Sequence, residues 1–453
     1  MSMNRGIPFL GLVLSARRVT AALAMLGGLA LVGVAAAPAW GFVAIKTADG
    51  HENITRAALS CSANGAPTGC FQGGRFHSTS MSQLAGGRLK NGAVEAPDAG
   101  IDPREPRPGY GFQFAEANHC MNGDYNIVGA RSYRQSMAAA RANLLLCVRG
   151  VTSRMATAVQ LAANLLPITS KRSAIPSTGC TFFKGEGSRF AILDGIPVTP
   201  SQAGGPKCAV INELGRGMHT AQDFYAHSNW TDAKLPGQNS VANPPGLGRT
   251  DVPDFLRFTC SGGGTVSCSP LTETFPAGLV TACNEGGKVP IFGRYPGAPG
   301  CNDSTAMTGA IAEASGGITH GTLNKDNGTI NPRTGAATKP GNPRGKIKDV
   351  NGVTNYQRAI TGAINQTRAT WSDFIAALQR VYGPAKSQLM VRVLTCDKPW
   401  QPKTCPPSGA PATGGGSTAG VADPALFGAG GAAVVAGAGM LVFTRRRGGA
   451  SRG

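Results

Sequence analysis

Two histidines and an aspartate recur at intervals of four in the segment GRGMHTAQDFYAHSNWTD, residues 215–232. On an α-helix, residues four apart lie on one face, so the side chains of His219, Asp223 and His227 would project together. Imidazole nitrogen and carboxylate oxygen are ligands that zinc takes in proteins. The alternative is a buried His–Asp hydrogen bond within a packed helix. Three residues in register, followed by Ser-Asn-Trp, favour the metal site.

The sequence around these residues predicts the helix that must position them. Beside the polar residues, apolar residues recur at steps of three and four; these are Val210, Leu214, Met218, Ala221 and Phe224. We predict a helix over 207–228, a second over 127–166, which is rich in Ala and Leu, and a third over 354–382, whose apolar residues follow one face. Segments 170–205 and 232–310 are dominated by Gly, Pro and Cys. The predicted fold is all-α, a helical core that carries long, disulfide-pinned loop insertions.

The chain is long and basic. Its 453 residues are enough for one large or two ordinary domains. A net charge of +19 favours anionic partners such as phospholipid or another phosphodiester polymer. Basic and aromatic residues do not interleave as they do in nucleic-acid-binding motifs, and no CxxC pair is present. We therefore expect neither a specific nucleic-acid motif nor a thiolate zinc site.

Residues 1–39 resemble an export signal peptide. Arginines precede an apolar run over 19–36, and Ala-Pro-Ala at 37–39 offers small residues for cleavage. A membrane-retained helix is the alternative. Twelve cysteines, an even number, agree with an oxidising exterior. Close neighbours could close small loops, with the connectivity left open: Cys61/Cys70, Cys260/Cys268, Cys283/Cys301 and Cys396/Cys405.

The C-terminus carries a second targeting signal. Residues 401–424 form a linker rich in Pro, Gly, Ser and Thr, and Ala-Pro-Ala-Thr-Gly at 410–414 resembles the sortase recognition pentapeptide, with Ala410 where leucine is usual. Residues 425–453 hold an apolar stretch that suffices to span a bilayer, followed by three arginines that would stay on the cytoplasmic side. We predict an extracellular protein that is anchored to the cell wall or, if Ala410 prevents sortase recognition, to the membrane by a transmembrane helix.

Residues 40–400 lie between the two signals and form one predicted domain. Its segment GRGMHTAQDFYAHSNW resembles the signature of the Het-C (heterokaryon incompatibility) family, whose domain is similar to zinc-dependent phospholipase C and to the single-strand nucleases. WGFVAIKTADGHENITRAAL, residues 40–59, matches the same superfamily. The resemblance implies an all-helical domain with two or three zinc ions. It also implies that Trp40, exposed by cleavage after Ala39, binds metal through its amino group and carbonyl, with His51 nearby.

The resemblance implies further ligands at matching motifs. GAVEAPDAGID implies Asp98, with Asp102 as the alternative, and ANHCMNGDY implies His119. His119 could instead pack beside a disulfide formed by Cys120. The helix supplies the remaining central ligands, with Asp223 as the bridging carboxylate. The complete set of metal ligands expected is Trp40, His51, Asp98, His119, His219, Asp223, His227 and His320.

THGTLNKD, residues 319–326, resembles a further Het-C motif and implies His320 as the last of these ligands. The phospholipases place a glutamate four residues after this histidine, where the present chain has Asn324, with Asp326 beyond it. This departure leaves the third metal open. His77 has no motif around it and is expected to be a surface or loop histidine.

The chemistry expected of such a cluster is phosphodiester hydrolysis. Zinc ions lower the pKa of a bound water and polarise a phosphoryl oxygen, and Asp98 could align or deprotonate that water as the catalytic carboxylate. The favoured function is an exported, surface-tethered, metal-dependent phosphodiester hydrolase of the phospholipase C type. The alternatives are a Het-C-like surface module for adhesion or interaction, whose metal is structural, and a secreted nuclease.

Overall fold

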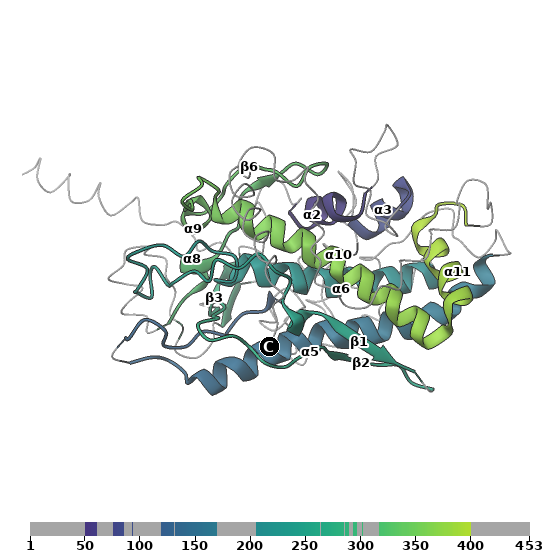
Figure 1. The fold of residues 1–453 in the computed structure, drawn as a ribbon, viewed down its shortest axis with the longest axis horizontal. Coiled ribbons are helices and arrows are strands. Elements are labelled where there is room, and N and C mark those ends of the chain that lie inside the picture. Colours follow the sequence, from purple (N-terminus) through teal and green to yellow (C-terminus); the bar gives the residue numbers. More distant parts are fainter. Residues whose placement is uncertain are drawn as a thin grey trace, which may run out of the picture.

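Helices dominate the part of the chain that the structure describes, and its strands are short. The structure is a computed structural model (Figure 1). The described residues are 50–60, 76–85, 93, 119–130, 132–169, 205–262, 264–284, 286–289, 293–296, 301 and 317–399. The predicted helical class is confirmed at this coarse level.

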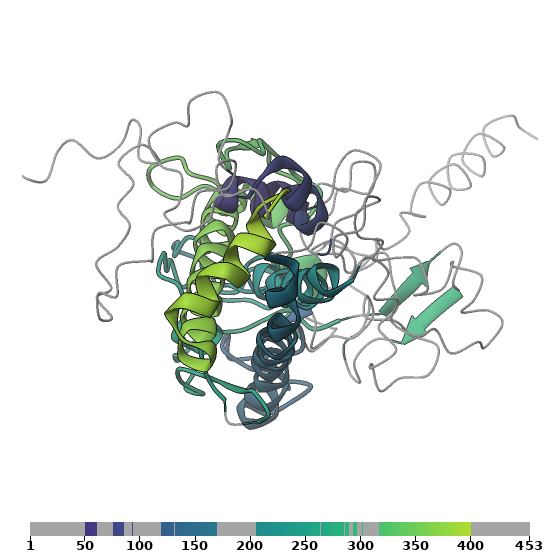
Figure 2. The same ribbon diagram turned by 90° about the vertical axis from the view of Figure 1, so that its right-hand side faces the viewer.

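Three long helices form the core of the described residues. They are α5 (Met137–Ala162), α6 (Pro206–His227) and α10 (Asn355–Tyr382). Helix α6 packs against both of the others, and Figure 2 shows α5 and α10 on different sides of it. From Lys207 to His227 every residue of α6 except Asn212 is buried. The polar residues of α6 must therefore find partners inside the protein.

The predicted helices over 207–228 and 354–382 are confirmed, and the one over 127–166 is too long at its N-terminus. Helix α5 begins only after Ser136, whose hydroxyl accepts a hydrogen bond from the backbone N–H of Ala139 as an N-cap. Just before the cap, Arg134 and Tyr133 bind the buried carboxylate of Asp124, which holds this segment in a non-helical path.

Shorter helices and short antiparallel strand pairs surround the core. The segment predicted as loop over 232–310 contains two antiparallel hairpins, which were not predicted because four-residue strands are too short to show a period of two. The remaining helical elements are α2 (Gly50–Leu59), α3 (Ser78–Ala85), η3 (Ala163–Thr169), η5 (Asp254–Leu256), α8 (His320–Leu323), α9 (Pro343–Lys346) and α11 (Pro384–Thr395). The paired strands are β1 (Phe258–Ser261) with β2 (Ser267–Pro270), β3 (Gly286–Val289) with β4 (Gly293–Pro296), and β5 (Thr329–Ile330) with β6 (Ala337–Lys339).

Disulfides close loops within the insertions and tie one segment to the core. Two of the pairs considered from the sequence are confirmed: Cys260–Cys268 joins β1 to β2, and Cys283–Cys301 closes a loop before α8. A third bond, Cys120–Cys147, was not predicted and ties the segment before α5 to that helix. Cys396 is also disulfide-bonded, whereas Cys61, Cys70 and Cys405 lie outside the described residues.

The predicted targeting segments lie outside the described residues. These are the signal peptide over 1–39, the linker over 401–424 and the apolar tail over 425–453. Among the residues that the structure does describe, no helix combines the length and the apolar character needed to span a membrane.

Candidate metal centre

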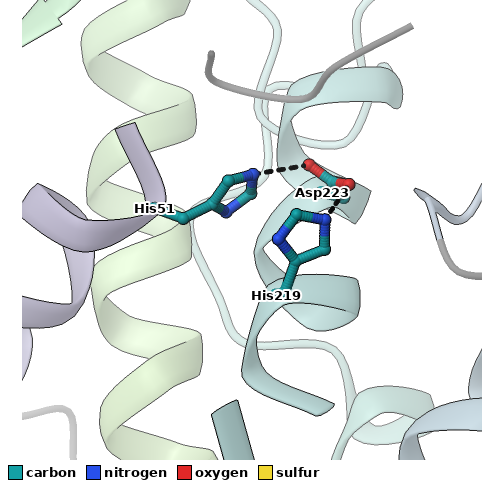
Figure 3. A group of neighbouring side chains, drawn as sticks. All are labelled: His51, His219 and Asp223. Carbon is teal, nitrogen blue, oxygen red and sulfur yellow. Dashed lines mark ion pairs between the residues drawn. The ribbon is translucent and has the colours of Figure 1, made fainter. Parts of the chain in front are cut away.

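The first cluster consists of His51, His219 and Asp223 (Figure 3). His51 lies on α2, and the other two lie one turn apart on α6. The Nε2 atom of His51 is 3.2 Å from Oδ1 of Asp223, and Nε2 of His219 is 3.1 Å from Oδ2. Two ligand atoms at about 2.1 Å from a tetrahedral zinc ion are about 3.4 Å apart. The first cluster therefore has the spacing of a ligand set.

The second cluster consists of His227, His320 and Asp326. His227 ends α6 and His320 begins α8. Nε2 of His320 is 3.0 Å from Oδ2 of Asp326, and Nε2 of His227 is 3.9 Å from Oδ1. The longer distance exceeds a hydrogen bond, yet it suits two atoms that share an ion.

His119 lies between the two clusters. Its Nδ1 is 2.5 Å from Oδ2 of Asp223, and its ring centroid is 5.4 Å from that of His219 and 6.3 Å from that of His227. Its backbone carbonyl accepts a hydrogen bond from Nδ1 of His227 at 3.0 Å. The sequence left open whether His119 packs beside a disulfide or joins the site. In the structure the neighbouring Cys120 is disulfide-bonded to Cys147, and the His119 ring contacts Asp223 of the first cluster.

Hydrogen bonds outside the clusters orient the imidazole rings. Oε1 of Gln222 lies 2.8 Å from Nδ1 of His51, while Nε2 of Gln222 donates to the hydroxyls of Thr55 and Thr367. With Nδ1 of His51 as the donor, its Nε2 carries the lone pair and points toward Asp223. His227 follows the same pattern through the carbonyl of His119. Such bonds to the distal nitrogen are typical of histidines that bind metal.

Asn324, the position where the phospholipase pattern has a glutamate, does not join either cluster. Helix α8 ends at Leu323, and Asn324 has extended backbone angles, φ −62° and ψ 147°. The four-residue spacing from His320 therefore no longer places the two side chains on one helical face. Asn324 contacts the distal Nδ1 of His320 at 3.1 Å instead, and the extended chain brings Asp326 to its Nε2.

Burial, reinforced by neighbouring imidazoles, lowers the pKa of two of the histidines, His219 and His227. Burial, together with the neighbouring His51, lowers the pKa of His219 to about 3. Burial also lowers the pKa of His227 to about 4, against the opposing effect of Asp223 and Asp326. Burial alone would raise the pKa of Asp223, but the surrounding His219 and His51 outweigh it and hold that pKa well below its usual range. At neutral pH His219 and His227 are therefore neutral and Asp223 is ionised, which are the protonation states that binding a cation requires.

Among the buried ligand atoms, Nε2 of His227 and Oδ1 of Asp223 have no hydrogen-bond partner within the described residues. A buried polar atom without a partner is costly, and a cation coordinated there would supply the missing interaction. The residues present therefore fit a metal ion. Nitrogen and carboxylate donors suit zinc, and they also suit other divalent transition metals.

No family model, curated protein or solved structure matches this chain. Five of the expected ligands fall into the two clusters, and a sixth, His119, contacts Asp223. Trp40, Asp98 and its alternative Asp102 lie outside the described residues. His77 belongs to neither cluster; it is half-buried, and its backbone N–H donates to the backbone carbonyl of Thr395 on α11.

Sequence reasoning did not assign Asp326 as a ligand or Gln222 as an orienting residue. Asp326 stands six residues after His320, a spacing that has no meaning on a regular helix. Gln222 immediately precedes Asp223, and its role depends on α2 packing beside α6, which the sequence alone does not reveal. In the sequence, the only indication for Asp326 and Gln222 is that each lies close to a predicted ligand.

Proposed function

We propose that this chain is a metal-dependent phosphodiester hydrolase of the phospholipase C type, with zinc ions held by the first and second clusters. The observation that carries the proposal is the succession of His219, Asp223 and His227 along one buried helix, each facing ligands from another element. His119 contacts Asp223 and His227 and brings the two clusters into one neighbourhood. The likeness of the motifs to zinc phospholipase C supports the same reading.

The roles of the residues follow from their donors. His51, His219 and Asp223 would hold one ion, and His227, His320 and Asp326 a second. Bound zinc supplies a Lewis acid for a phosphoryl oxygen and a water of lowered pKa. Through their hydrogen bonds to Nδ1, Gln222 and the carbonyl of His119 would leave Nε2 of His51 and of His227 available to hold the ions. Asp98 is proposed, from the resemblance alone, as the carboxylate that aligns the water.

The proposed partner and location follow from charge and from the terminal sequences. The net charge of +19 would draw an anionic phospholipid or phosphodiester polymer toward the site. We propose that the signal peptide exports the chain and that the tail tethers it to the cell wall or the membrane outside the cell. Neither phospholipid nor nucleic acid is favoured by a feature of the described residues.

One observation favours a second candidate, a surface module for adhesion or interaction whose metal is structural. Every residue of the two clusters is at most 5% exposed. Structural metal sites are closed by protein ligands, whereas catalytic sites keep a position for water or substrate. Activity separates the two candidates.

The experiment combines metal analysis with hydrolysis assays on the purified chain. We expect about two zinc equivalents and hydrolysis of p-nitrophenylphosphorylcholine that chelation abolishes and zinc restores. Hydrolysis of single-stranded DNA instead would support the nuclease. Two bound zinc ions without hydrolysis of either substrate, and with a large loss of thermal stability on chelation, would support the structural module. A chain that binds no metal contradicts all three.

A further inference from the structure

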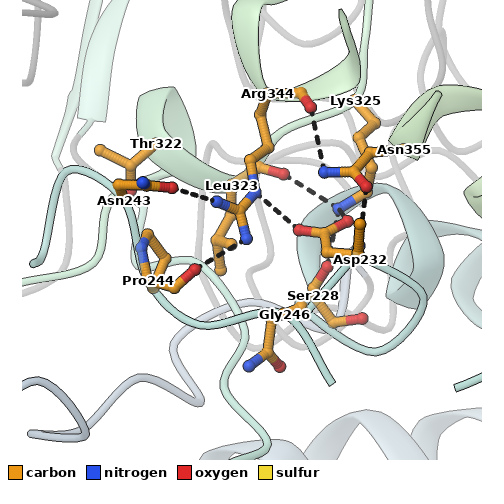
Figure 4. A network of polar contacts seen from close by, with 12 residues as sticks. Ser228, Asp232, Asn243, Pro244, Gly246, Thr322, Leu323, Lys325, Arg344 and Asn355 are labelled. Atoms are coloured by element: carbon orange, nitrogen blue, oxygen red, sulfur yellow. Dashed lines mark hydrogen bonds and ion pairs between the residues drawn. The ribbon is translucent and has the colours of Figure 1, made fainter. Parts of the chain in front are cut away.

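Three charged residues are buried beside the second cluster. Asp232 and Lys325 are 0% exposed and Arg344 is 4% exposed. Oδ1 of Asp232 lies 3.0 Å from Nζ of Lys325, and its Oδ2 lies 2.7 Å from Nε of Arg344 (Figure 4). Buried ion pairs usually stabilise a protein no more than apolar residues of the same volume, because desolvation offsets their attraction. Stability alone therefore does not account for this network.

The Lys325 ammonium reaches the backbone beside the ligands of the second cluster. Its Nζ donates to the carbonyl of Ser228 at 2.7 Å and to that of Leu323 at 3.0 Å. Ser228 directly follows His227, and Leu323 ends the short helix that His320 begins. Lys325 is also the residue before Asp326. One side chain thus joins the three backbone segments that carry the three ligands.

The backbone of Lys325 strengthens the same junction. Its N–H donates to the carbonyl of Ala226, in the last turn of α6, at 3.1 Å. A cation beside the carbonyls at a helix C-terminus is also favoured by the helix dipole. Asp232 balances the charge of Lys325, and Figure 4 shows Ser228, Asp232 and Lys325 converging on one point.

Arg344 also forms an ion pair with Asp232, but its other hydrogen bonds go to different residues from those of Lys325. Its Nη1 donates to Oδ1 of Asn243 at 3.0 Å and its Nη2 to the carbonyl of Pro244 at 2.9 Å. These bonds hold the loop that follows α6 and do not go to the backbone next to a ligand. Arg344 therefore offers a matched control, since removing either cation leaves one cation paired with Asp232.

We propose that Lys325 is the positioning residue of the second cluster, so that its loss releases the second ion and leaves the first in place. The proposal rests on the proposed function, because it takes both clusters as metal sites. Residues that support ligands from outside the coordination sphere typically change metal affinity by roughly 10- to 100-fold when they are replaced.

The test compares Lys325→Met with Arg344→Met in the full chain. Zinc stoichiometry is measured after equilibrium dialysis, and Co²⁺ is titrated in parallel because its visible absorption reports the geometry of each site. We expect two ions in the wild type and in Arg344→Met. In Lys325→Met we expect the second ion to bind at least tenfold more weakly, with the absorption of the first unchanged.

Wild-type affinity for both ions in Lys325→Met would overturn the proposal, as would an equal loss in Arg344→Met. If Lys325→Met fails to fold, the triple variant Lys325→Met/Asp232→Leu/Arg344→Met leaves no unpaired charge. We expect this variant to bind one ion, and two ions would overturn the proposal. A wild-type chain without metal would instead refute the proposed function, and this inference with it.

Discussion

Among single residues, Asp223 has the largest share of contacts in the centre. One carboxylate oxygen faces His51, and the other faces His219 and His119. Three imidazoles thus converge on one carboxylate that is 0% exposed. No other residue of the two clusters holds as many candidate ligands in place.

We expect Asp223→Asn to remove more metal than any other single ligand substitution. The amide keeps the shape of the side chain but loses the negative charge that offsets the charge of a bound cation. Metal content by plasma mass spectrometry should fall by at least one equivalent. His77→Ala is the control, since His77 belongs to neither cluster. Full metal content in both variants would show that the cluster is only a structural hydrogen-bond group.

Gln222 tests whether the rings are held for coordination. Gln222→Leu removes the acceptor of the His51 Nδ1–H, and we expect roughly 10- to 100-fold weaker binding of the first ion. Gln222→Glu keeps an acceptor for the His51 Nδ1–H at that position and should retain tight binding. Competition with a zinc-chelating dye measures both. Equal affinities in the two variants would argue against an orienting role.

The sequence predicted the residues of the centre best where the backbone is regular. His219, Asp223 and His227 were identified because a helix turns their spacing into a common face. Asp326 could not be assigned as the carboxylate beside His320, because α8 ends at Leu323 and the extended backbone beyond it gives no regular spacing of side chains. The second cluster therefore required the structure.

Among the elements, α6 depends on close approach by its neighbours. A Cβ atom on Gly362 of α10 would lie 2.5 Å from the ring of Tyr225 and 3.0 Å from Cγ2 of Thr231. A Cβ atom on Gly217 would lie 2.2 Å from Cε of Met155, the mobile end of a flexible side chain on α5. An added Cβ atom is therefore harder to accommodate at Gly362 on α10 than at Gly217 on α6.

We expect Gly362→Ala to lower the free energy of unfolding by roughly 1–3 kcal/mol, because overpacking displaces a buried ring. Gly217→Ala should be near neutral, since Met155 can move and alanine favours a helix by about 1 kcal/mol over glycine. Urea denaturation of both variants measures the difference. A larger loss in Gly217→Ala would contradict this account of the packing.

The elements differ in how far the sequence could predict them. Helices α6 and α10 were predicted from apolar residues that recur with helical spacing and α5 from its Ala and Leu content, but the start of α5 at the Ser136 cap was missed. The Cys120–Cys147 bond joins residues 27 apart in sequence, so no local pattern indicates it. Pairs that close short loops, such as Cys260–Cys268, could be anticipated.

Across the whole molecule, two buried histidines, His219 and His227, make the free energy of unfolding depend on pH. The pKa of His219 falls from 6.5 to about 3 on folding, and that of His227 to about 4. Between these values and 6.5 the unfolded chain binds more protons than the folded chain, so stability declines as pH falls below 6.5. At pH 5.5 each of the two groups lowers the free energy of unfolding by roughly 1 kcal/mol relative to alkaline pH.

The metal-free chain should accordingly lose stability between pH 7.5 and pH 5.5. Urea midpoints of the chelator-treated protein measure this loss, and His77→Ala, which leaves the histidines of both clusters in place, should show the same decline. Saturating zinc should oppose it, because zinc and protons compete for the same nitrogens. A midpoint that rises on acidification would contradict the burial of neutral imidazoles.

The most direct test of the central claim is an anomalous difference map from crystals of the zinc-loaded chain at the zinc absorption edge. We predict one peak within about 2.1 Å of Nε2 of His51, Nε2 of His219 and an oxygen of Asp223. We predict a second peak at the same distance from the two Nε2 atoms and the carboxylate of the second cluster. Crystals with no peak at either cluster, at saturating zinc, would contradict the account.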